Sequence, residues 1–192
     1  TPYDKVLKLV KDGLRGGVRV LQLRDKTSKD EEIEDIAIEL QTLCREYGVP
    51  FIIDDRVELA KKIDGDGIHI GKDDKGTIEA RDILGNKKII GVSCYGDIDL
   101  ALKAQRDGAS YVAFGSFFSS LTKPKATIVE KNIIKEAKQI LDIPICVIGG
   151  ITTQNSRELI ELGADMVCVV SDLWGDGRPY EKALIFEGYF RG

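Results

Sequence analysis

The chain has 192 residues, of which 43% are hydrophobic, 31% charged and 7% aromatic, and this composition excludes a disordered or fibrous protein. Its 28 Lys and Arg against 32 Asp and Glu give a formal net charge of −4. That balance provides no broad positive field, so we expect neither a nucleic acid nor a membrane surface as partner.

Short runs rich in Val and Ile alternate with longer amphipathic stretches along the chain. Strands are predicted at residues 18–23, 50–53, 67–70, 88–92, 111–114, 144–148 and 166–170. Helices are predicted at residues 3–15, 28–47, 57–62, 77–84, 97–106, 130–141 and 153–162. This alternation is typical of repeated βα units around a parallel sheet.

The predicted fold is α/β, a TIM (β/α)8 barrel that residues 1–192 form as a single domain. No Pro- or Ser-rich linker and no shift in composition interrupts the spacing, which favours one domain. A closed barrel needs eight strands and usually about 250 residues, whereas this chain begins with a predicted helix. We therefore expect its first strand upstream of Thr1. The alternative is an open doubly wound sheet, but the G-x-G-x-x-G turn usual in that fold is absent.

Polar side chains follow the first predicted strand, at the end where barrels of this kind carry their catalytic groups. Gln22, Arg24 and Lys26 alternate along the chain, so they share one face, which we expect to point into the barrel mouth. Two cations and an amide suit a polyphosphate. The alternative is an edge strand with a charged outer face.

Carboxylates follow the next two predicted strands, Asp54 and Asp55 after one and Asp74 after the other. Because Mg²⁺ is usually held by one or two carboxylates together with water and phosphate, Asp55 and Asp74 are the predicted metal ligands. Acidic residues at strand ends also cap helices, which is the alternative for either residue alone.

The later strands are followed by hydroxyl groups and a lysine. Ser93 follows one strand, and the long loop at residues 115–124 carries Ser120, Thr122 and Lys123. Such a loop is a candidate clamp over a substrate, and a flexible connector is the alternative.

The last two strands lead into Gly149-Gly150 and Val170-Ser171. The loops after the final strands of a barrel frequently bind a phosphate through backbone N–H groups, which glycines leave accessible. The sequence therefore predicts two anion sites in one mouth, one built on cations and a metal and one on backbone amides.

The cysteines and the single histidine do not form an obvious catalytic group. Cysteines stand at positions 44, 94, 146 and 168 without a C-x-x-C pair, which predicts buried reduced thiols and a cytoplasmic location. No signal peptide or membrane-spanning run is visible. His69 lies between two isoleucines, which favours a hydrogen-bonded core histidine over a catalytic one. Since no nucleophile is paired with a base, covalent catalysis is disfavoured.

Several of these motifs, in order and in register, resemble the thiamine-phosphate synthase (thiamine-phosphate pyrophosphorylase) family. The resemblance covers essentially the whole chain and runs through Gln22-Leu-Arg-Asp-Lys26, Phe51-Ile-Ile-Asp-Asp-Arg56, Gly67-Ile-His-Ile-Gly71, Gly91-Val-Ser93, Ser120-Leu-Thr-Lys123, Ile148-Gly-Gly-Ile151 and Val170-Ser171. It implies a transferase that joins 4-amino-2-methyl-5-(diphosphooxymethyl)pyrimidine to 4-methyl-5-(2-phosphoethyl)thiazole. The products would be thiamine monophosphate and pyrophosphate.

The resemblance also implies roles for single residues. Positions matching the family's pyrimidine diphosphate site are Gln22, Arg24, Lys26, Asp54, Ser93 and Lys123, with Gln22 and Ser93 at the ring. Positions matching its thiazole phosphate site are Ser120, Thr122, Gly150, Val170 and Ser171, and the Mg²⁺ ligands match Asp55 and Asp74. Catalysis would fall to Arg24, Lys26, Ser93 and Lys123. The implied reaction needs no protein nucleophile, because Mg²⁺-assisted loss of pyrophosphate leaves a stabilised pyrimidine cation that the thiazole nitrogen captures.

Three positions depart from the family's usual pattern. Asp54 replaces an Asn and adds a negative charge beside the diphosphate, Lys72 replaces a Gln, and Ser120 stands where Thr is frequent. We hypothesise that Lys72 offsets the charge of Asp54.

Two other functions fit parts of the pattern. A thiazole tautomerase shares the fold, but it needs a histidine just after the serine at position 93, where this chain has Cys94 and Tyr95. A non-catalytic paralogue that binds phosphate ligands is the second alternative. The expected partners are small-molecule substrates, and the oligomeric state stays open, a homo-oligomer included.

Overall fold

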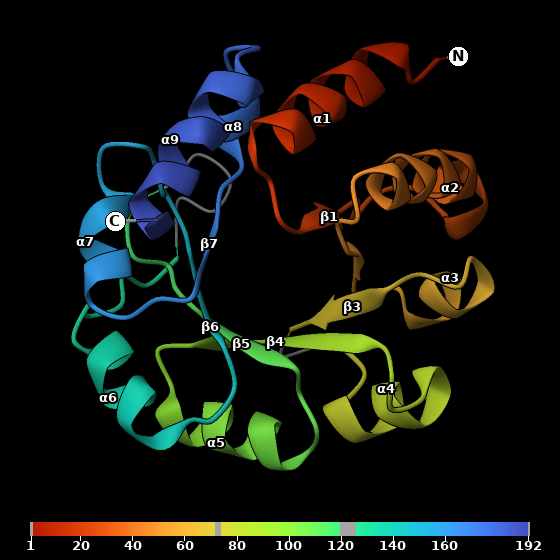
Figure 1. Cartoon of the computed structure of the whole chain (residues 1–192). Helices are drawn as coiled ribbons and strands as arrows, with labels where there is room; N and C mark the ends of the chain where they lie inside the picture. Colours follow the sequence, from red (N-terminus) through yellow and green to blue (C-terminus); the bar gives the residue numbers. More distant parts are fainter. Residues whose placement is uncertain (1, 72–73, 120–125, 192) are drawn as a thin grey trace.

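The strands form one parallel sheet that curls into an incomplete barrel (Figure 1). The computed structural model describes residues 2–71, 74–119 and 126–191. Within those ranges the sheet has seven strands, ordered as in the chain: β1 (Leu21–Leu23), β2 (Phe51–Asp54), β3 (Gly67–Ile70), β4 (Ile89–Tyr95), β5 (Tyr111–Phe114), β6 (Ile145–Ile148) and β7 (Met166–Cys168). Since all neighbours are parallel, their carboxyl ends meet at one end of the barrel.

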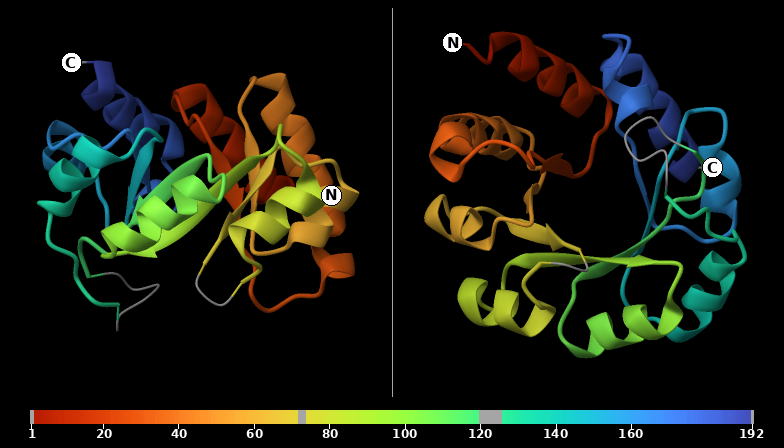
Figure 2. Two further views of the ribbon diagram at one scale, coloured as in Figure 1. Left: turned by 90° about the horizontal axis from the view of Figure 1, so that it is seen from below. Right: turned by 180° about the vertical axis from the view of Figure 1, so that it is seen from behind.

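The helices lie on the outer side of the sheet (Figures 1 and 2). In the described part of the chain they are α1 (Asp4–Gly16), α2 (Asp30–Glu46), α3 (Val57–Lys62), α4 (Thr77–Leu84), α5 (Ile98–Arg106), α6 (Ile133–Ile140), α7 (Ser156–Glu161), α8 (Ser171–Trp174) and α9 (Pro179–Arg191). The predicted helices are confirmed, with ends that shift by a few residues. Helices α8 and α9 were not predicted. In α9 the apolar residues 183–186 form a continuous run without helical spacing. None of the helices in the described ranges is both long and apolar enough to cross a membrane.

Strand β1 is shorter than predicted because the residues before it cap helix α1. Gly17 has a φ angle of 111°, and the N–H groups of Gly17 and Val18 donate to the carbonyls of Leu14 and Gly13. These two bonds form a Schellman cap, which satisfies the last carbonyls of the helix. The chain joins the sheet only afterwards, at Leu21.

The two faces of the sheet have different surroundings. On the outer face, Ile53, Ile68 and Phe114 are at most 1% exposed and pack in one large apolar core with the helices. Because side chains alternate along a strand, the neighbours of these residues point into the barrel, among them Asp54 and His69. The outer layer therefore supplies the stable scaffold, and the inner face is left to carry a site.

Helices α1 and α9 lie side by side where the edge strands β1 and β7 come round toward each other (Figure 1). A Cβ atom on Gly16 would stand 2.4 Å from the carbonyl oxygen of Tyr180, and one on Gly13 would stand 3.0 Å from the ring of Trp174. Glycine therefore lets α1 approach α8 and α9 closely.

The predicted α/β class and the parallel strand order are confirmed. The closed eight-stranded barrel, however, is not formed by the described strands, which leave β1 and β7 as the two edges of the sheet. A first strand upstream of Thr1 stays a prediction.

Candidate active site

The carboxyl ends of the strands surround a cavity of about 1600 Å³. It is lined by the described residues that sequence reasoning selected, namely Gln22, Arg24, Lys26, Asp54, Asp55, Asp74, Ser93, Gly149, Gly150, Val170 and Ser171. Lys72, Ser120, Thr122 and Lys123 lie outside the described residues. The structure thus brings the selected side chains to one mouth, whereas their chemical roles stay predictions.

One side of the mouth, which we call the charged wall, consists of Gln22, Arg24, Lys26, Asp54 and Asp55. The carboxylate of Asp54 is its centre. Gln22 Nε2 donates to Asp54 Oδ1 at 2.8 Å, while Arg24 Nε and Lys26 Nζ both lie 3.3 Å from Asp54 Oδ2. Lys26 also forms an ion pair with Asp55. The polar face of β1 therefore points into the cavity, and the charged outer face considered as its alternative is not formed.

The environment of Asp54 explains how this chain accommodates the unusual carboxylate. Asp54 is only 7% exposed, and a buried carboxylate is costly unless it is paired and hydrogen-bonded. Arg24 and Lys26 supply that pairing, yet their side chains remain 43% and 45% exposed. The two cations can therefore turn toward a ligand in the mouth. The hypothesis that Lys72 offsets Asp54 lies outside the described residues and stays untested.

The two predicted metal ligands, Asp55 and Asp74, follow β2 and β3. Neither side chain caps a helix, since α3 and α4 begin after Arg56 and Gly76 without a side-chain cap. Asp55 adopts a φ angle of 64°, and its N–H donates to the carbonyl of His69 at 2.8 Å. Asp74 Oδ2 accepts a hydrogen bond from the N–H of Gly71 at 2.6 Å. Asp55 is thus held through its backbone and through the ion pair of its carboxylate with Lys26, and Asp74 is held through its carboxylate.

The donor set at these two residues suits a hard cation that keeps much of its water. In the described ranges no cluster of three or more His, Cys, Asp or Glu side chains is placed to hold a metal ion. Two carboxylates are what Mg²⁺ commonly takes from a protein when water and substrate phosphates supply the other ligands. Asp55 and Asp74 therefore fit Mg²⁺ bound together with a phosphorylated substrate.

The loop after β1 is ordered by two residues that sequence reasoning did not select. Asp25 accepts hydrogen bonds from the backbone N–H groups of Ser28 and Thr27, which hold the pKa of its carboxyl well below the usual value. The guanidinium of Arg56 donates to the carbonyls of Asp25 and Ser28, both at 2.6 Å. These bonds fix the backbone from which Arg24 and Lys26 extend. The role of Asp25 and Arg56 is hard to predict from the sequence, because charged residues are common in loops.

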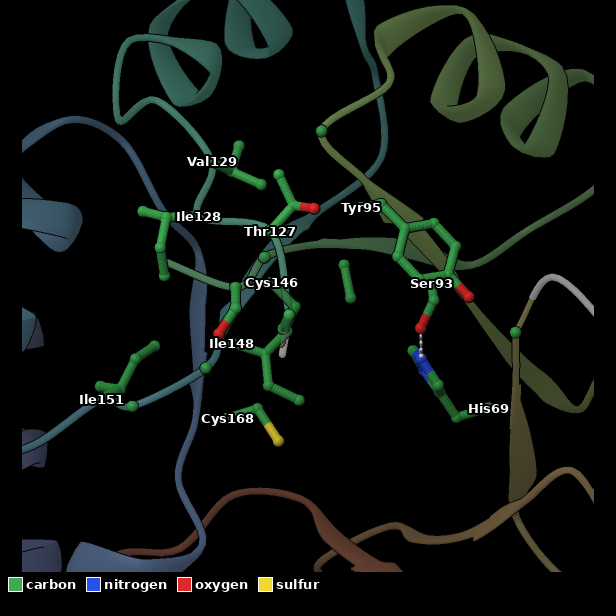
Figure 3. A pocket seen from close by; sticks show the side chains of 18 of the residues that line it. His69, Ser93, Tyr95, Thr127, Ile128, Val129, Cys146, Ile148, Ile151 and Cys168 are labelled. Atoms are coloured by element: carbon green, nitrogen blue, oxygen red, sulfur yellow. Dashed lines mark hydrogen bonds between the residues drawn. The ribbon is translucent and has the colours of Figure 1, made fainter. Parts of the chain in front are cut away.

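His69 is buried at 8% exposure and hydrogen-bonded, as predicted for a core histidine. It also lines the cavity, which sequence reasoning missed. Its Nε2 lies 2.8 Å from Ser93 Oγ (Figure 3), and its Nδ1 lies 2.9 Å from the hydroxyl of Tyr111. The histidine is therefore connected to a predicted substrate-binding serine.

The cysteines match the prediction of free thiols. Cys44, Cys94 and Cys146 are buried and Cys168 is partly buried, and no disulfide joins them. Burial raises the pKa of Cys94 to about 12 and that of Cys168 to about 11. Cys146 and Cys168 line the cavity, but as neutral thiols they are poor nucleophiles.

The opposite side of the mouth, which we call the apolar wall, consists of Ile128, Ile148, Ile151 and Val170. Three of these side chains are large and exposed, Ile128 and Val170 at 53% and Ile148 at 36%. Figure 3 shows Ile128, Ile148 and Ile151 on the side of the cavity away from His69. An apolar patch at the edge of a cavity marks a binding surface for an apolar group.

Gly149 and Gly150 lie between the apolar wall and the loop after β5. Their φ angles are 101° and 60°, and a Cβ atom at Gly149 would stand 1.8 Å from Ser116 Oγ. A Cβ atom at Gly150 would stand 2.4 Å from the carbonyl oxygen of Ser119. The glycines are thus required by the close approach of this loop, a reason that sequence reasoning did not consider. Their proposed use in phosphate binding remains a prediction.

Comparison with known proteins gives one consistent result. The family model described as thiamine monophosphate synthase matches residues 1–173. A thiamine-phosphate synthase from Wolinella succinogenes is 46% identical over 188 residues, which is 96% of this chain and 86% of the relative. Another from Janthinobacterium sp. is 44% identical over 186 residues, covering 97% of this chain and 90% of the relative.

The fold agrees with that result. The solved structure of a thiamine phosphate pyrophosphorylase from Pyrococcus furiosus superimposes with a TM-score of 0.88 at 30% sequence identity. The match covers 96% of this chain and 89% of that one.

Proposed function

The chain belongs to the thiamine monophosphate synthase family, and from this premise we propose that it joins a pyrimidine methyl diphosphate to a thiazole phosphate. It is a transferase of thiamine biosynthesis, as its relatives are. The proposed products are thiamine monophosphate and pyrophosphate. The observation that carries the proposal is a single cavity with the charged wall on one side and the apolar wall on the other.

The charged wall suits a diphosphate leaving group. Arg24 and Lys26 are the described cations at the mouth, and both are held near the cavity by Asp54. Charge that develops on departing pyrophosphate would be stabilised by cations already in position, which lowers the barrier to bond cleavage. Lys123 would be a further cation in this role.

Asp55 and Asp74 would hold Mg²⁺ against the same diphosphate. When bound, the ion neutralises charge on the phosphate oxygens and makes pyrophosphate a better leaving group. The chain's own contribution is to fix the backbone of Asp55, whose N–H donates to the His69 carbonyl, and the carboxylate of Asp74, which accepts from the N–H of Gly71.

The remaining parts of the cavity suit the two rings and the second phosphate. Gln22 and Ser93 would hold the pyrimidine, and the apolar wall would pack against the thiazole. Ser120, Thr122, Gly150, Val170 and Ser171 would bind the thiazole and its phosphate. Holding both rings in one cavity places the thiazole nitrogen next to the methylene carbon that loses pyrophosphate, and such positioning accelerates bond formation.

No protein nucleophile enters this scheme. The two thiols that line the cavity, Cys146 and Cys168, have pKa values raised by burial and remain neutral. Bond cleavage would precede capture of the pyrimidine cation by the thiazole. This order requires electrostatic stabilisation and positioning, which the charged and apolar walls can provide.

Pyrophosphate release tests the proposal directly. We expect release only when both substrates and Mg²⁺ are present, with thiamine monophosphate formed in equal amount. Isomerisation of a thiazole carboxylate without pyrophosphate release would instead identify a tautomerase. Binding of either phosphate ligand without turnover would identify a non-catalytic paralogue and overturn the proposal.

A further inference from the structure

Three inward-facing residues stand in one row across the sheet. His69 on β3 pairs in register with Gly91 on β4, and Gly91 pairs with Tyr111 on β5. A Cβ atom at Gly91 would lie 2.1 Å from the Cζ atom of Tyr111, so the phenol ring crosses over this glycine. The missing side chain at Gly91 is what allows Tyr111 to reach a residue two strands away.

A chain of hydrogen bonds leads from this row to the mouth. The Tyr111 hydroxyl lies 2.9 Å from Nδ1 of His69. Nε2 of His69 lies 2.8 Å from Ser93 Oγ, as Figure 3 shows. Ser93 lines the cavity at the next inward-facing position of β4 after Gly91. The hydroxyl that faces a ligand is therefore connected to a buried phenol through the imidazole.

The direction of these bonds follows from the buried phenol. Tyr111 is 9% exposed, and burial raises the pKa of its hydroxyl, which keeps it protonated. Within the described residues, Nδ1 of His69 is the partner that the structure gives to this hydroxyl. A buried O–H group needs an acceptor, so Tyr111 donates to Nδ1. The imidazole proton then sits on Nε2 and is donated to Ser93 Oγ, which leaves the Ser93 proton for the cavity.

Gln22 has its hydrogen-bonding direction fixed in a comparable way. Its Nε2 donates to Asp54 Oδ1 at 2.8 Å, and the other oxygen of the same carboxylate faces Arg24 and Lys26 at 3.3 Å each. The amide nitrogen of Gln22 is therefore turned toward Asp54, and its Oε1 is the atom left to accept a bond from a ligand.

We propose that Tyr111, His69 and Asp54 are positioning residues that set Ser93 as a donor and Gln22 as an acceptor toward the substrate ring. A neighbouring donor and acceptor are what the amino group and adjacent ring nitrogen of an aminopyrimidine present. An oxopyrimidine presents a carbonyl and a ring N–H, which reverses the pattern. The inference rests on the proposed function for the substrate class and explains why the amino form of the ring is selected.

The tautomer of His69 can be measured without any substrate. His69 is the single histidine of the chain, so ¹⁵N-histidine labelling gives one imidazole in the NMR spectrum. We expect a neutral ring with its proton on Nε2 in the wild-type protein. A proton on Nδ1, or on both nitrogens, would overturn the inference. Because this readout needs no turnover, it stands even if the proposed reaction fails.

Selectivity between ring types provides the second test. We expect the wild-type enzyme to favour the aminopyrimidine diphosphate over the oxopyrimidine analogue by at least about 100-fold in kcat/KM. Tyr111→Phe should reduce this preference by about tenfold through a higher KM for the aminopyrimidine, with the KM for the thiazole phosphate unchanged. Tyr189→Phe is the matched control, since it removes a phenol that donates to the Thr153 carbonyl, and neither of these two residues lines the cavity.

A double variant separates positioning from a purely structural role. If Tyr111 acts through Ser93, then Tyr111→Phe should have no further effect on ring preference in a Ser93→Ala background. Additive losses, or equal losses for both substrates, would show that Tyr111 only supports the fold and would overturn the inference. If the wild-type enzyme releases no pyrophosphate from either ring type, the proposed function fails, and the tautomer of His69 decides the inference alone.

Discussion

The charged wall and the apolar wall line the same cavity but differ in how their side chains are held. On the charged wall, each side chain that faces the cavity also contacts another of the set, so Asp54 restrains Gln22, Arg24 and Lys26 together. On the apolar wall, Ile128 and Val170 are more than half exposed and have no polar contact to orient them. The charged wall thus holds its groups in fixed positions, whereas the side chains of the apolar wall can adapt. This arrangement suits a charged leaving group on the first wall and an apolar acceptor ring on the second.

Removing a cation from the charged wall should have the largest effect. We expect Arg24→Ala to lower kcat by about 100- to 1000-fold, because the variant lacks the guanidinium that stabilises the negative charge developing on the departing pyrophosphate. Stability should change little, since the side chain is 43% exposed. Arg157→Ala, on the outer helix α7, serves as the control in a steady-state assay of pyrophosphate release. Wild-type turnover of Arg24→Ala would contradict the role of the charged wall.

Changing a predicted metal ligand should shift the dependence on magnesium. Asp55→Asn and Asp74→Asn are each expected to raise the Mg²⁺ concentration for half-maximal activity by at least about tenfold. The control is Asp142→Asn, whose exposed side chain lies at the opposite end of the barrel from the mouth. Titration of activity with MgCl₂ provides the measurement, and an unchanged midpoint in both variants would exclude these carboxylates as ligands.

Shortening the apolar wall should affect one substrate and spare the other. Ile148→Ala is expected to raise the KM for the thiazole phosphate by about tenfold, because it removes apolar area worth roughly 1–2 kcal/mol from the binding surface. The KM for the pyrimidine diphosphate should stay close to the wild-type value. Ile140→Ala removes a side chain of similar exposure, 44% against 36%, from the outer helix α6 and should change neither constant. Equal losses for both substrates would contradict the division of the mouth into two walls.

Neutralising Asp54 should strengthen diphosphate binding. In Asp54→Asn, Arg24 and Lys26 lose a competing carboxylate, while the side-chain oxygen of the new residue can still accept from Gln22 Nε2. We therefore expect the KM for the pyrimidine diphosphate to fall by about threefold. Adding Lys72→Gln tests the hypothesis that Lys72 offsets Asp54. If Lys72→Gln alone leaves diphosphate affinity unchanged while Asp54→Asn alters it, that compensation does not exist, and the offset comes from Arg24 and Lys26.

The smallest expected effect concerns the loop that supports the charged wall. The folded-state pKa of Asp25 is depressed, so its ionised form stabilises the fold above the ordinary value of 3.8, and this contribution is lost as pH falls below it. We expect Asp25→Asn to lower Tm by about 2 °C at neutral pH and by less under acidic conditions. Thermal melts across pH provide the measurement, and a difference that grows on acidification would contradict the assignment.

The charged wall could be predicted from the sequence because its residues stand out. Arg24 and Lys26 directly after an apolar strand have few structural explanations, and alternation alone places them on one face with Gln22. The apolar wall could not be predicted in this way. Ile148 inside a run of apolar residues looks the same whether it faces the helices or the mouth, and only the register of β6 decides.

The polar contacts of the site were also beyond sequence reasoning. Asp54 was recognised as unusual. Its partners, however, lie up to 32 positions earlier in the chain, on β1 and in the loop after it, and the pairing depends on how β1 and β2 align. His69 was expected in the core, and its link to Tyr111 requires the glycine at position 91, on the strand between the two residues. These contacts depend on how neighbouring strands pair, so no single segment of the sequence predicts them.

The close contact of helices α1 and α9 has a consequence for how the mouth keeps its width. In the described part of the chain, β1 and β7 are the edges of the sheet, and the charged wall begins at one edge while Val170 follows the other. On the outer side of the sheet, Gly16 of α1 rests against the backbone of Tyr180 of α9. A methyl group at position 16 would push α1 away from α9. We expect β1, and with it Arg24 and Lys26, to move away from Val170 on the other edge of the sheet.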